Sequence, residues 1–235
     1  MPTAPDILVT GATGSTGRAT ADALAAQGVS FRPMSRSASP NEFAVQADFD
    51  DVESLRAALR GVRAAYLVTP STEHAEAQQK RFIDLAVEAG VRHLVLLSQL
   101  GSVGDARVSL VDVRDIGEMA SRALTASAPM GIQTLTGPEA LTHSELAAHL
   151  SSATGRVIRF EDIPPAAFGE MLAGILPPWQ AEGLLEDYAH YARGEAADIS
   201  SAVPDTLGRP ARRFADFAAD NAAAFGGDGS DRPDR

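Results

Sequence analysis

The chain has no cysteine and only one lysine, Lys80, among its 235 residues. The absence of cysteine excludes disulfide bonds, thiolate catalysis and cysteine-ligated metals, and it fits a reducing compartment. The N-terminal residues lack the basic segment followed by an apolar one that is typical of a secretory signal. We therefore expect a cytoplasmic protein.

Positive charge is also scarce. Twenty Lys and Arg residues against 31 Asp and Glu residues give a net charge of −11, and no basic stripe is present. Because phosphate contacts dominate affinity for nucleic acids, we expect no direct binding to DNA or RNA. No apolar run approaches the roughly 20 residues that a membrane span needs. The five histidines lack the spacing of metal ligands, so we expect no metal site.

The most informative segment that is present is a glycine-rich turn, GATGSTG, which directly follows the apolar run Ile7–Val9 and precedes a helical pattern. Three glycines at a spacing of three let the backbone approach a pyrophosphate, and the next helix points its N-terminal N–H groups at that charge. A purely structural turn is the alternative. We expect the dinucleotide phosphates to contact Gly11, Thr13, Gly14, Ser15, Thr16 and Gly17.

Short apolar runs alternate with helical patterns through the first part of the chain. We expect strands at 6–10, 29–34, 43–46, 64–68 and 93–97, and helices at 15–27, 52–59 and 73–89. This alternation is typical of an α/β fold with a doubly wound, Rossmann-like parallel sheet. Pro33 lies inside the second strand, where it removes a hydrogen bond of the ladder.

The pattern changes beyond Ser98. We expect strands at 108–111, 132–136 and 157–160, and helices at 115–124, 142–153, 165–172, 179–191 and 212–225. Thr142 and Glu145 have the spacing of a capping box. We expect an NAD(P)-binding domain at 1–136, a small C-terminal α/β lobe on the substrate side at 137–225, and a disordered tail at 226–235.

Cofactor choice depends on the residue after the second strand. An acidic residue there binds the ribose hydroxyls of NAD, whereas an arginine accommodates the additional phosphate of NADP. The chain has Arg36 at this place and no acidic residue before Glu42, which favours NADP(H). An ordinary surface arginine is the alternative.

Further candidates follow the other strands, since ligands of open α/β sheets bind at the carboxyl ends of strands. After the third strand, Asp48 is placed to accept a hydrogen bond from the adenine amino group, and Phe49 to line the adenine pocket. Thr69 and Pro70 follow the fourth strand, and Ser98 follows the fifth. Together these residues predict one crevice.

Several segments together resemble the NmrA-like atypical short-chain dehydrogenases. They are ILVTGATGSTG at 7–17, the Thr-Pro pair at 69–70, VRHLVLLS at 91–98, VDVRDI at 111–116 and LTGPEAL at 135–141. The resemblance continues to the segment 208–217 and so covers nearly the whole chain. That family includes NAD(P)H:quinone oxidoreductases, azoreductase-type enzymes and a redox-sensing regulator. The resemblance therefore implies a small-molecule substrate that is quinone-like; the oligomeric state does not follow from it.

The chain departs from this family after Ser98. Relatives continue there through a further helix and a sixth parallel strand, whereas this chain runs almost directly into the apolar segment at 108–111. A strand and its crossover, of order 30 residues or more, are absent. We expect the segment 132–135 to take the place beside the fifth strand, with the helix at 115–124 as its crossover.

No catalytic group can be assigned. The usual acid of short-chain dehydrogenases is a tyrosine with a lysine four positions later, and none of the three tyrosines has such a partner. Asp112 and Asp115 are separated by only two residues and could act as paired carboxylates, but a helix cap is the simpler role for Asp115. Trp179, followed by Tyr188 and Tyr191, either lines a substrate pocket or packs in the core.

Two functions remain open from the sequence. The first is an NADPH-dependent oxidoreductase that transfers a hydride to a small quinone-like acceptor. The second is an NADP(H)-binding redox sensor, scaffold or auxiliary biosynthetic protein with little or no turnover. The intact glycine turn fits both functions, whereas the absent unit favours the second.

Overall fold

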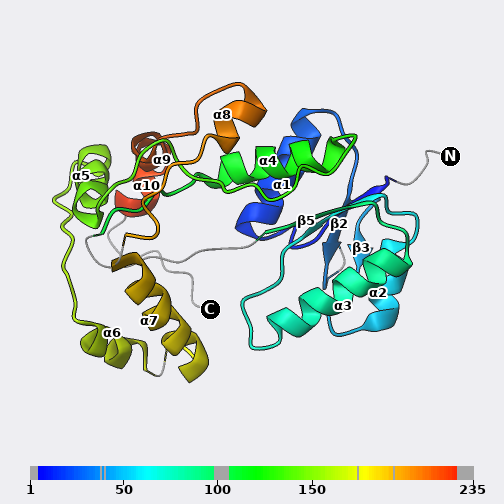
Figure 1. Ribbon diagram of the computed structural model, residues 1–235, viewed down its shortest axis with the longest axis horizontal. Helices are drawn as coiled ribbons and strands as arrows, with labels where there is room; N and C mark the ends of the chain where they lie inside the picture. Colours follow the sequence, from blue (N-terminus) through cyan, green and yellow to red (C-terminus); the bar gives the residue numbers. More distant parts are fainter. Residues whose placement is uncertain are drawn as a thin grey trace. The chain divides into compact units, whose positions relative to one another are not determined.

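The computed structural model describes residues 5–37, 39, 41–97, 106–173, 175–192 and 194–226, with the backbone alone at 165, 187–192 and 226. These residues form two compact units (Figure 1). The first unit contains the chain up to Leu97 together with Val113–Gln133, and the second contains residues 106–112 and the chain from Thr134 onward. The domain boundary at 136 stays a prediction. The predicted tail lies outside the described residues, except for Gly226.

A parallel sheet forms the centre of the first unit. Its strands stand in the order β3-β2-β1-β4-β5, which is the doubly wound arrangement expected from the sequence. The bounds are β1 Ile7–Val9, β2 Arg32–Ser35, β3 Val45–Gln46, β4 Ala64–Leu67 and β5 His93–Leu96. The sheet accommodates Pro33 within β2, opposite Val9 of β1. The predicted α/β fold class is confirmed.

Four helices cover the two faces of this sheet (Figure 1). Their bounds are α1 Ser15–Ala26, α2 Val52–Leu59, α3 Ala75–Glu88 and α4 Val113–Thr125. Successive strand residues point to opposite faces, so Leu8 of β1 packs in the layer of α2 and α3, whereas Ile7 packs in the layer of α1 and α4. Strands buried on both faces are continuously apolar, as the sequence of β1 is.

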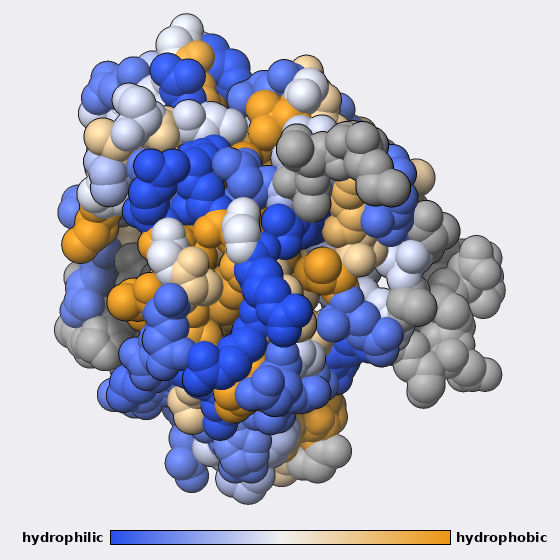
Figure 2. Space-filling model, turned by 90° about the vertical axis from the view of Figure 1, so that its right-hand side faces the viewer, coloured by the Kyte–Doolittle hydropathy of each residue, from blue (hydrophilic) through white to orange (hydrophobic). Residues whose placement is uncertain are grey.

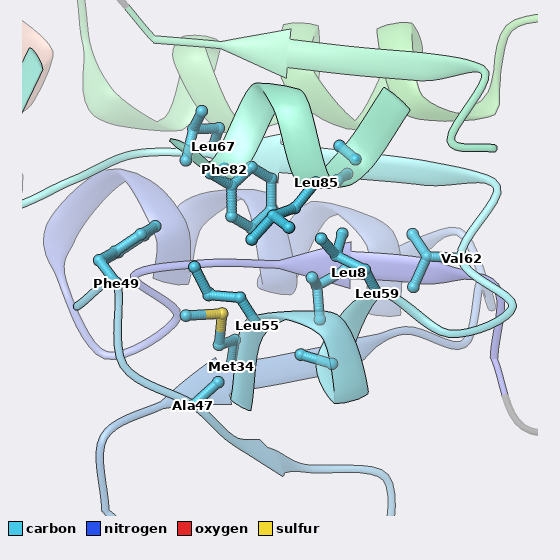
Figure 3. Packing of buried hydrophobic residues seen from close by; sticks show 13 residues of the cluster. Leu8, Met34, Ala47, Phe49, Leu55, Leu59, Val62, Leu67, Phe82 and Leu85 are labelled. Carbon is cyan, nitrogen blue, oxygen red and sulfur yellow. The ribbon is translucent and has the colours of Figure 1, made fainter. Parts of the chain in front are cut away.

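The layer of α2 and α3 contains the larger apolar cluster (Figure 3). Phe82 of α3 is fully buried, and its ring centroid lies 5.9 Å from that of Phe49. Burial of such a side chain contributes about 1.5–3 kcal/mol relative to exposure. Phe49 lies at one end of the cluster, so the chain segment after β3 is fixed by core packing.

The other layer depends on a close crossing of α1 and α4. A Cβ atom at Gly117 of α4 would lie 2.4 Å from the carbonyl carbon of Ala19 in α1. The side-chain amide of Gln27 also donates to Ser121 Oγ, at 3.0 Å. Glycine at position 117 is therefore what lets the two helix backbones meet.

The second unit is helical within the described residues. Its helices are α5 His143–Thr154, α6 Pro165–Leu172, α7 Pro178–Ala192, α8 Ala202–Leu207, α9 Phe214–Asp220 and α10 Ala222–Gly226. The predicted capping box opens α5: Thr142 Oγ1 accepts from the Glu145 N–H, and Glu145 accepts from the Thr142 N–H. The single helix predicted at 212–225 is divided at Asn221, and α8 was not predicted.

The strands predicted at 108–111, 132–136 and 157–160 are not formed, and the expectation of a C-terminal α/β lobe is wrong for the described residues. Val108 makes only an isolated antiparallel bridge with Leu141. Ile132 is 98% exposed, so the prediction that its segment pairs with β5 is also wrong. A β-strand needs a neighbouring backbone for its hydrogen bonds, and an apolar run without that neighbour stays irregular.

The face shown in Figure 2 is mostly hydrophilic, with apolar residues in smaller groups. Within the part of the chain that the structure describes, no helix is both long and apolar enough to cross a membrane. In the same residues, no three His, Cys, Asp or Glu side chains come together as a group that could hold a metal ion.

Candidate functional site

The glycine turn begins where β1 and β4 are tied together. Thr10 is fully buried, and its hydroxyl donates to the Val68 carbonyl at 3.1 Å and accepts from the Val68 N–H at 2.9 Å. Gly11 follows with a φ of +59°, and a Cβ atom there would lie 2.6 Å from Val68 Cγ1. Both the backbone conformation and the close approach of β4 therefore require glycine at position 11.

At the end of the turn, the first residues of α1 pack directly against the start of the turn. A Cβ atom at Gly17 would lie 2.1 Å from the Gly11 carbonyl oxygen, so only glycine fits. Gly14 is the N-cap of α1, and no side chain caps the helix. The first N–H groups of an uncapped helix are available for an anion, and the helix dipole favours negative charge there. The turn thus has the geometry of a phosphate-binding loop.

A cavity of about 370 Å³ lies at the carboxyl-end side of the same sheet. Its lining comes from the loops after β2, β3 and β4 and from the start of α3. It brings together eight residues, all in the first unit: Arg36, Asp48, Phe49, Asp50, Pro70, Thr72, His74 and Gln78. Four of the residues predicted from the sequence therefore share one cavity, namely Arg36, Asp48, Phe49 and Pro70.

Arg36 is exposed at this cavity. Its backbone is held by Gln46, whose side-chain amide donates to the Arg36 carbonyl at 2.9 Å. Among the described residues, no carboxylate forms an ion pair with its guanidinium. A guanidinium that has no internal ion-pair partner is available to an anionic ligand.

Asp48 and Phe49 form one wall of the cavity. Asp48 Oδ1 accepts from the Asp50 N–H at 3.0 Å, and the Asp48 N–H donates to Ser54 Oγ at 3.0 Å, which fixes the position of the carboxylate. Phe49 is only 9% exposed because its ring is part of the core. This wall combines a carboxylate acceptor with an aromatic surface, which suits a flat heterocycle that carries an amino group.

Helix α3 holds this wall from the other side. Arg81 Nη1 donates to the Phe49 carbonyl at 2.7 Å and to Asp50 Oδ1 at 3.1 Å. Gln78 Nε2 donates to Asp50 Oδ2 at 2.9 Å. The two oxygens of Asp50 are therefore both engaged by α3, and Asp50 works as an anchor for the loop after β3.

The remaining predicted residues lie elsewhere. The glycine turn is at the end of β1, in the same sheet, but its residues do not line the cavity. The Thr69 hydroxyl accepts from the side-chain amide of Gln79 at 2.9 Å, and Thr69 does not line the cavity either. Ser98 lies outside the described residues.

The cavity residues that the sequence reading missed are Asp50, Thr72, His74 and Gln78. Asp50 continues the loop after β3, and the others belong to the loop after β4 and the first turn of α3. Ligands bind at the carboxyl ends of strands. Extending this rule from the end of each strand to the start of the next helix would have included these residues.

No tyrosine and lysine form a catalytic pair among the described side chains. Lys80 pairs with Glu76 on the exposed surface of α3, and this contact lowers the pKa of Glu76 and raises that of Lys80. Tyr66 is buried in the layer of α1 and α4, where burial raises its pKa and keeps the phenol protonated. The sheet separates the two residues. The side chains of Tyr188 and Tyr191 are not described.

The other catalytic candidates gain no support. Helix α4 begins at Val113, so Asp115 is inside the first turn, and the cap role inferred for it is wrong. Asp115 and Asp112 are both buried and both have interaction partners. Trp179 stands near the start of α7 and is 40% exposed, so it is not a core residue.

Comparison with known proteins gives a consistent result. Residues 3–109 match the sequence profile of the NmrA-like family. A (4-alkanoyl-5-oxo-2,5-dihydrofuran-3-yl)methyl phosphate reductase of Streptomyces griseus is 32% identical over 280 aligned positions, which cover 93% of this chain and 99% of the relative. An NAD(P)H azoreductase of Xenophilus azovorans is 29% identical over 283 positions, covering 94% and 99% of the two chains.

The alignment with the Streptomyces reductase also shows that this chain is shorter than the relative. Because 93% of 235 residues is about 219, about 61 of the 280 aligned positions have no residue from this chain. This agrees with the expectation that an internal unit of 30 residues or more is absent. Its place after Ser98 stays a prediction.

The fold is shared with solved structures of low sequence identity. The NADPH-dependent quinone oxidoreductase of Escherichia coli in complex with NADPH superposes with a TM-score of 0.79 at 21% identity, covering 91% of this chain and 99% of that one. A triphenylmethane reductase of Citrobacter has a TM-score of 0.78 at 17% identity, covering 93% and 99%. The sequence identity to the Streptomyces reductase and the matched profile show that the chain belongs to the NmrA-like family.

Proposed function

We propose that this protein binds NADP(H) and catalyses the NADPH-dependent reduction of a small quinone-like acceptor. One observation carries the proposal. A single cavity joins Arg36, which has no ion-pair partner among the described residues, to the wall of Asp48 and Phe49, beside a glycine turn that is open to a phosphate. Those are the features that an adenosine 2′-phosphate and a pyrophosphate require.

The residues fit the parts of such a cofactor in order along the sheet. The N–H groups at the start of α1 suit the pyrophosphate, because Gly11 and Gly17 leave no Cβ atom between it and the backbone. Arg36 binds the 2′-phosphate with a charge-assisted hydrogen bond. Asp48 accepts from the adenine amino group, and Phe49 lines the base.

The chemistry is a hydride transfer. NADPH, held by the glycine turn, Arg36 and Asp48, would supply a hydride, and a quinone that accepts this hydride and one proton from water would become a hydroquinone. The chain contributes mainly orientation, since no Tyr–Lys pair is present among the described side chains to donate that proton. Two relatives support a reductase: one is an azoreductase, and the other is quinone oxidoreductase 2 of Escherichia coli, 23% identical over 254 positions.

A second function is favoured by a specific observation. About 61 positions of the Streptomyces relative have no counterpart here. The sequence predicts that they belong to the substrate side, and a shorter substrate side would orient an acceptor poorly. Misorientation alone costs on the order of a hundredfold in rate. An NADP(H)-binding sensor or scaffold with slow or no turnover is therefore the alternative to an efficient enzyme.

The first experiment tests the cofactor. We expect NADPH to bind about ten- to hundredfold more tightly than NADH, since a charge-assisted contact contributes about 1.5–3 kcal/mol. Arg36→Ala removes most of this preference by weakening NADPH alone. Arg92→Ala is the matched control, because Arg92 is exposed in the same unit and does not line the cavity. Equal dissociation constants for NADPH and NADH in the native protein would exclude the role of Arg36.

The second experiment separates the enzyme from the sensor. NADPH oxidation is followed with and without a panel of quinones, beside a binding titration of the same preparation. Quinone-dependent oxidation of many NADPH molecules per protein molecule supports the reductase. Tight NADPH binding without such turnover supports the sensor, and the absence of NADPH binding contradicts both.

A further inference from the structure

Gln78 is the cavity residue whose hydrogen bonding is incomplete. It is 7% exposed, it lies in the first turns of α3, and it lines the cavity beside Phe49. Its Oε1 is buried and has no hydrogen-bond partner. An unpaired buried carbonyl oxygen is unfavourable, so a ligand that donates a hydrogen bond to it gains affinity.

The orientation of this amide follows from its neighbours. The carboxylate of Asp50 only accepts hydrogen bonds, so the Gln78 side chain presents its Nε2 to Asp50 Oδ2, at 2.9 Å. Arg81 Nη1 donates to the other oxygen of Asp50 at 3.1 Å, which holds this carboxylate in place. The oxygen of Gln78 is therefore held as the acceptor side of the amide. Because Gln78 lines the cavity, this oxygen is the acceptor that its side chain offers to a ligand there.

Two acceptors then belong to the same cavity. Asp48 Oδ1 receives the Asp50 N–H, but a carboxylate has about four acceptor positions, so Asp48 retains capacity for a ligand. Gln78 supplies the second acceptor from α3. The amino group of adenine has two N–H donors, whereas hypoxanthine has a carbonyl oxygen at the same position. Two acceptors that face that position would favour the amine and disfavour the carbonyl.

We propose that Gln78 is a base-specificity residue of the cofactor site: it accepts a hydrogen bond from the adenine amino group and selects adenine over a base with a carbonyl in its place. The inference rests on the proposed binding of NADP(H). It adds a second reader of the base to Asp48 and gives the buried, unpaired oxygen of Gln78 a partner.

The test compares NADPH with the reduced form of nicotinamide hypoxanthine dinucleotide phosphate. Dissociation constants of the full chain are measured by calorimetry for both cofactors. We expect the native protein to bind the hypoxanthine cofactor about tenfold or more weakly, which corresponds to about 1.4 kcal/mol. In Gln78→Met the ratio of the two constants falls to about threefold or less, because NADPH is weakened and the hypoxanthine cofactor is nearly unaffected.

Gln27→Met is the matched control. Gln27 also donates its side-chain amide to a neighbour in the first unit, Ser121, but it lies in the layer of α1 and α4, away from the cavity. In Gln27→Met the ratio of the two dissociation constants should stay at the native value. If Gln78→Met does not fold, Gln78→Leu takes its place in the comparison, and a ratio near one in the native protein overturns the role of Gln78 without any variant.

The outcomes are distinct from those that test the proposed function. A ratio near one in the native protein, or a ratio that Gln78→Met leaves unchanged, overturns the role of Gln78 while NADPH binding stands. Binding of neither cofactor overturns both the role of Gln78 and the proposed function.

Discussion

The two compact units bury their apolar side chains in different ways. Among the described residues, the twelve largest side chains with almost no exposure all belong to the first unit, with the single exception of Val203. Exposed large apolar side chains occur in both units, such as Ile132 at 98% in the first and Val157 at 81% in the second, so the contrast lies in the fully buried side chains. The sheet accounts for the contrast, because a sheet covered on both faces buries every residue of its central strands, whereas a helix buries one stripe.

The comparison also separates the candidate site from the rest of the chain. The glycine turn and all residues of the cavity belong to the first unit. The loops that carry them are anchored in the packed core, as Phe49 shows by lining the cavity and packing against Phe82. Loops positioned by a rigid scaffold are where binding residues are usually found. We therefore expect the two units to respond differently to substitution.

The largest expected effect concerns Phe82, which is fully buried in the first unit. Phe82→Ala should lower the free energy of unfolding by about 3–5 kcal/mol, because it leaves a cavity in the core. Ile175→Ala in the second unit should change it by less than about 0.5 kcal/mol. Urea unfolding followed by circular dichroism measures both. Similar losses in the two variants would show that the contrast in packing has no energetic meaning.

Trp179 sharpens the same experiment. It is the only tryptophan in the chain and belongs to the second unit, so its fluorescence follows the unfolding of that unit. If the units unfold independently, Phe82→Ala shifts the transition seen by circular dichroism and leaves the fluorescence transition in place. A common shift of both signals would show that the units unfold together.

An intermediate effect is expected for glycines in helices. At Gly117 a Cβ atom would lie 2.4 Å from the backbone of Ala19, whereas at Gly183 of α7 no atom lies within 4 Å. Gly117→Ala should destabilise the protein by about 1–3 kcal/mol, because the two helices must separate. Gly183→Ala should stabilise it by about 0.5–1 kcal/mol, because alanine is the better helix former. Thermal unfolding of both variants measures these effects. An unchanged stability of Gly117→Ala would contradict this account.

The smallest effect is expected at the start of α5 in the second unit. Thr142→Ala removes one bond of the capping box and should cost about 1 kcal/mol. The backbone N–H of Thr142, and then Arg107, lower the pKa of Glu145. Its stabilising contribution is therefore complete above the ordinary glutamate pKa and is lost as the pH falls below it.

Measuring the unfolding of the native protein and Glu145→Ala at neutral pH and near pH 3 checks this linkage. The difference between the two proteins should shrink at the lower pH, because Glu145 loses its stabilising contribution as it takes up a proton. A constant difference across this range would mean that Glu145 does not take part in the cap. Thr154→Ala, at the other end of α5, serves as a control without a role in the box.

The elements of the first unit were predictable because their signals are local. The apolar run of β1 is followed at once by the glycine turn, and Gly28 ends α1 with a φ of +69°. Helix α2 has the predicted bounds of Val52–Leu59, because Asp51 caps it through the N–H groups of Glu53 and Ser54. Four of the predicted site residues share a cavity for the same reason: each lies within three residues of the end of a strand.

What the sequence alone determined is thus the five parallel strands and the four helices of the first unit, since each depends on residues that are close together in the chain. Tertiary structure decided which apolar runs become strands. The segments at 108–111 and 132–136 have strand-like sequences, yet they form no ladder in the structure, because hydrogen bonds between strands require a neighbour that the local sequence does not supply. Gln78 joined the site for a related reason. Only the packing of α3 against the loop after β3 brings its amide to Asp50.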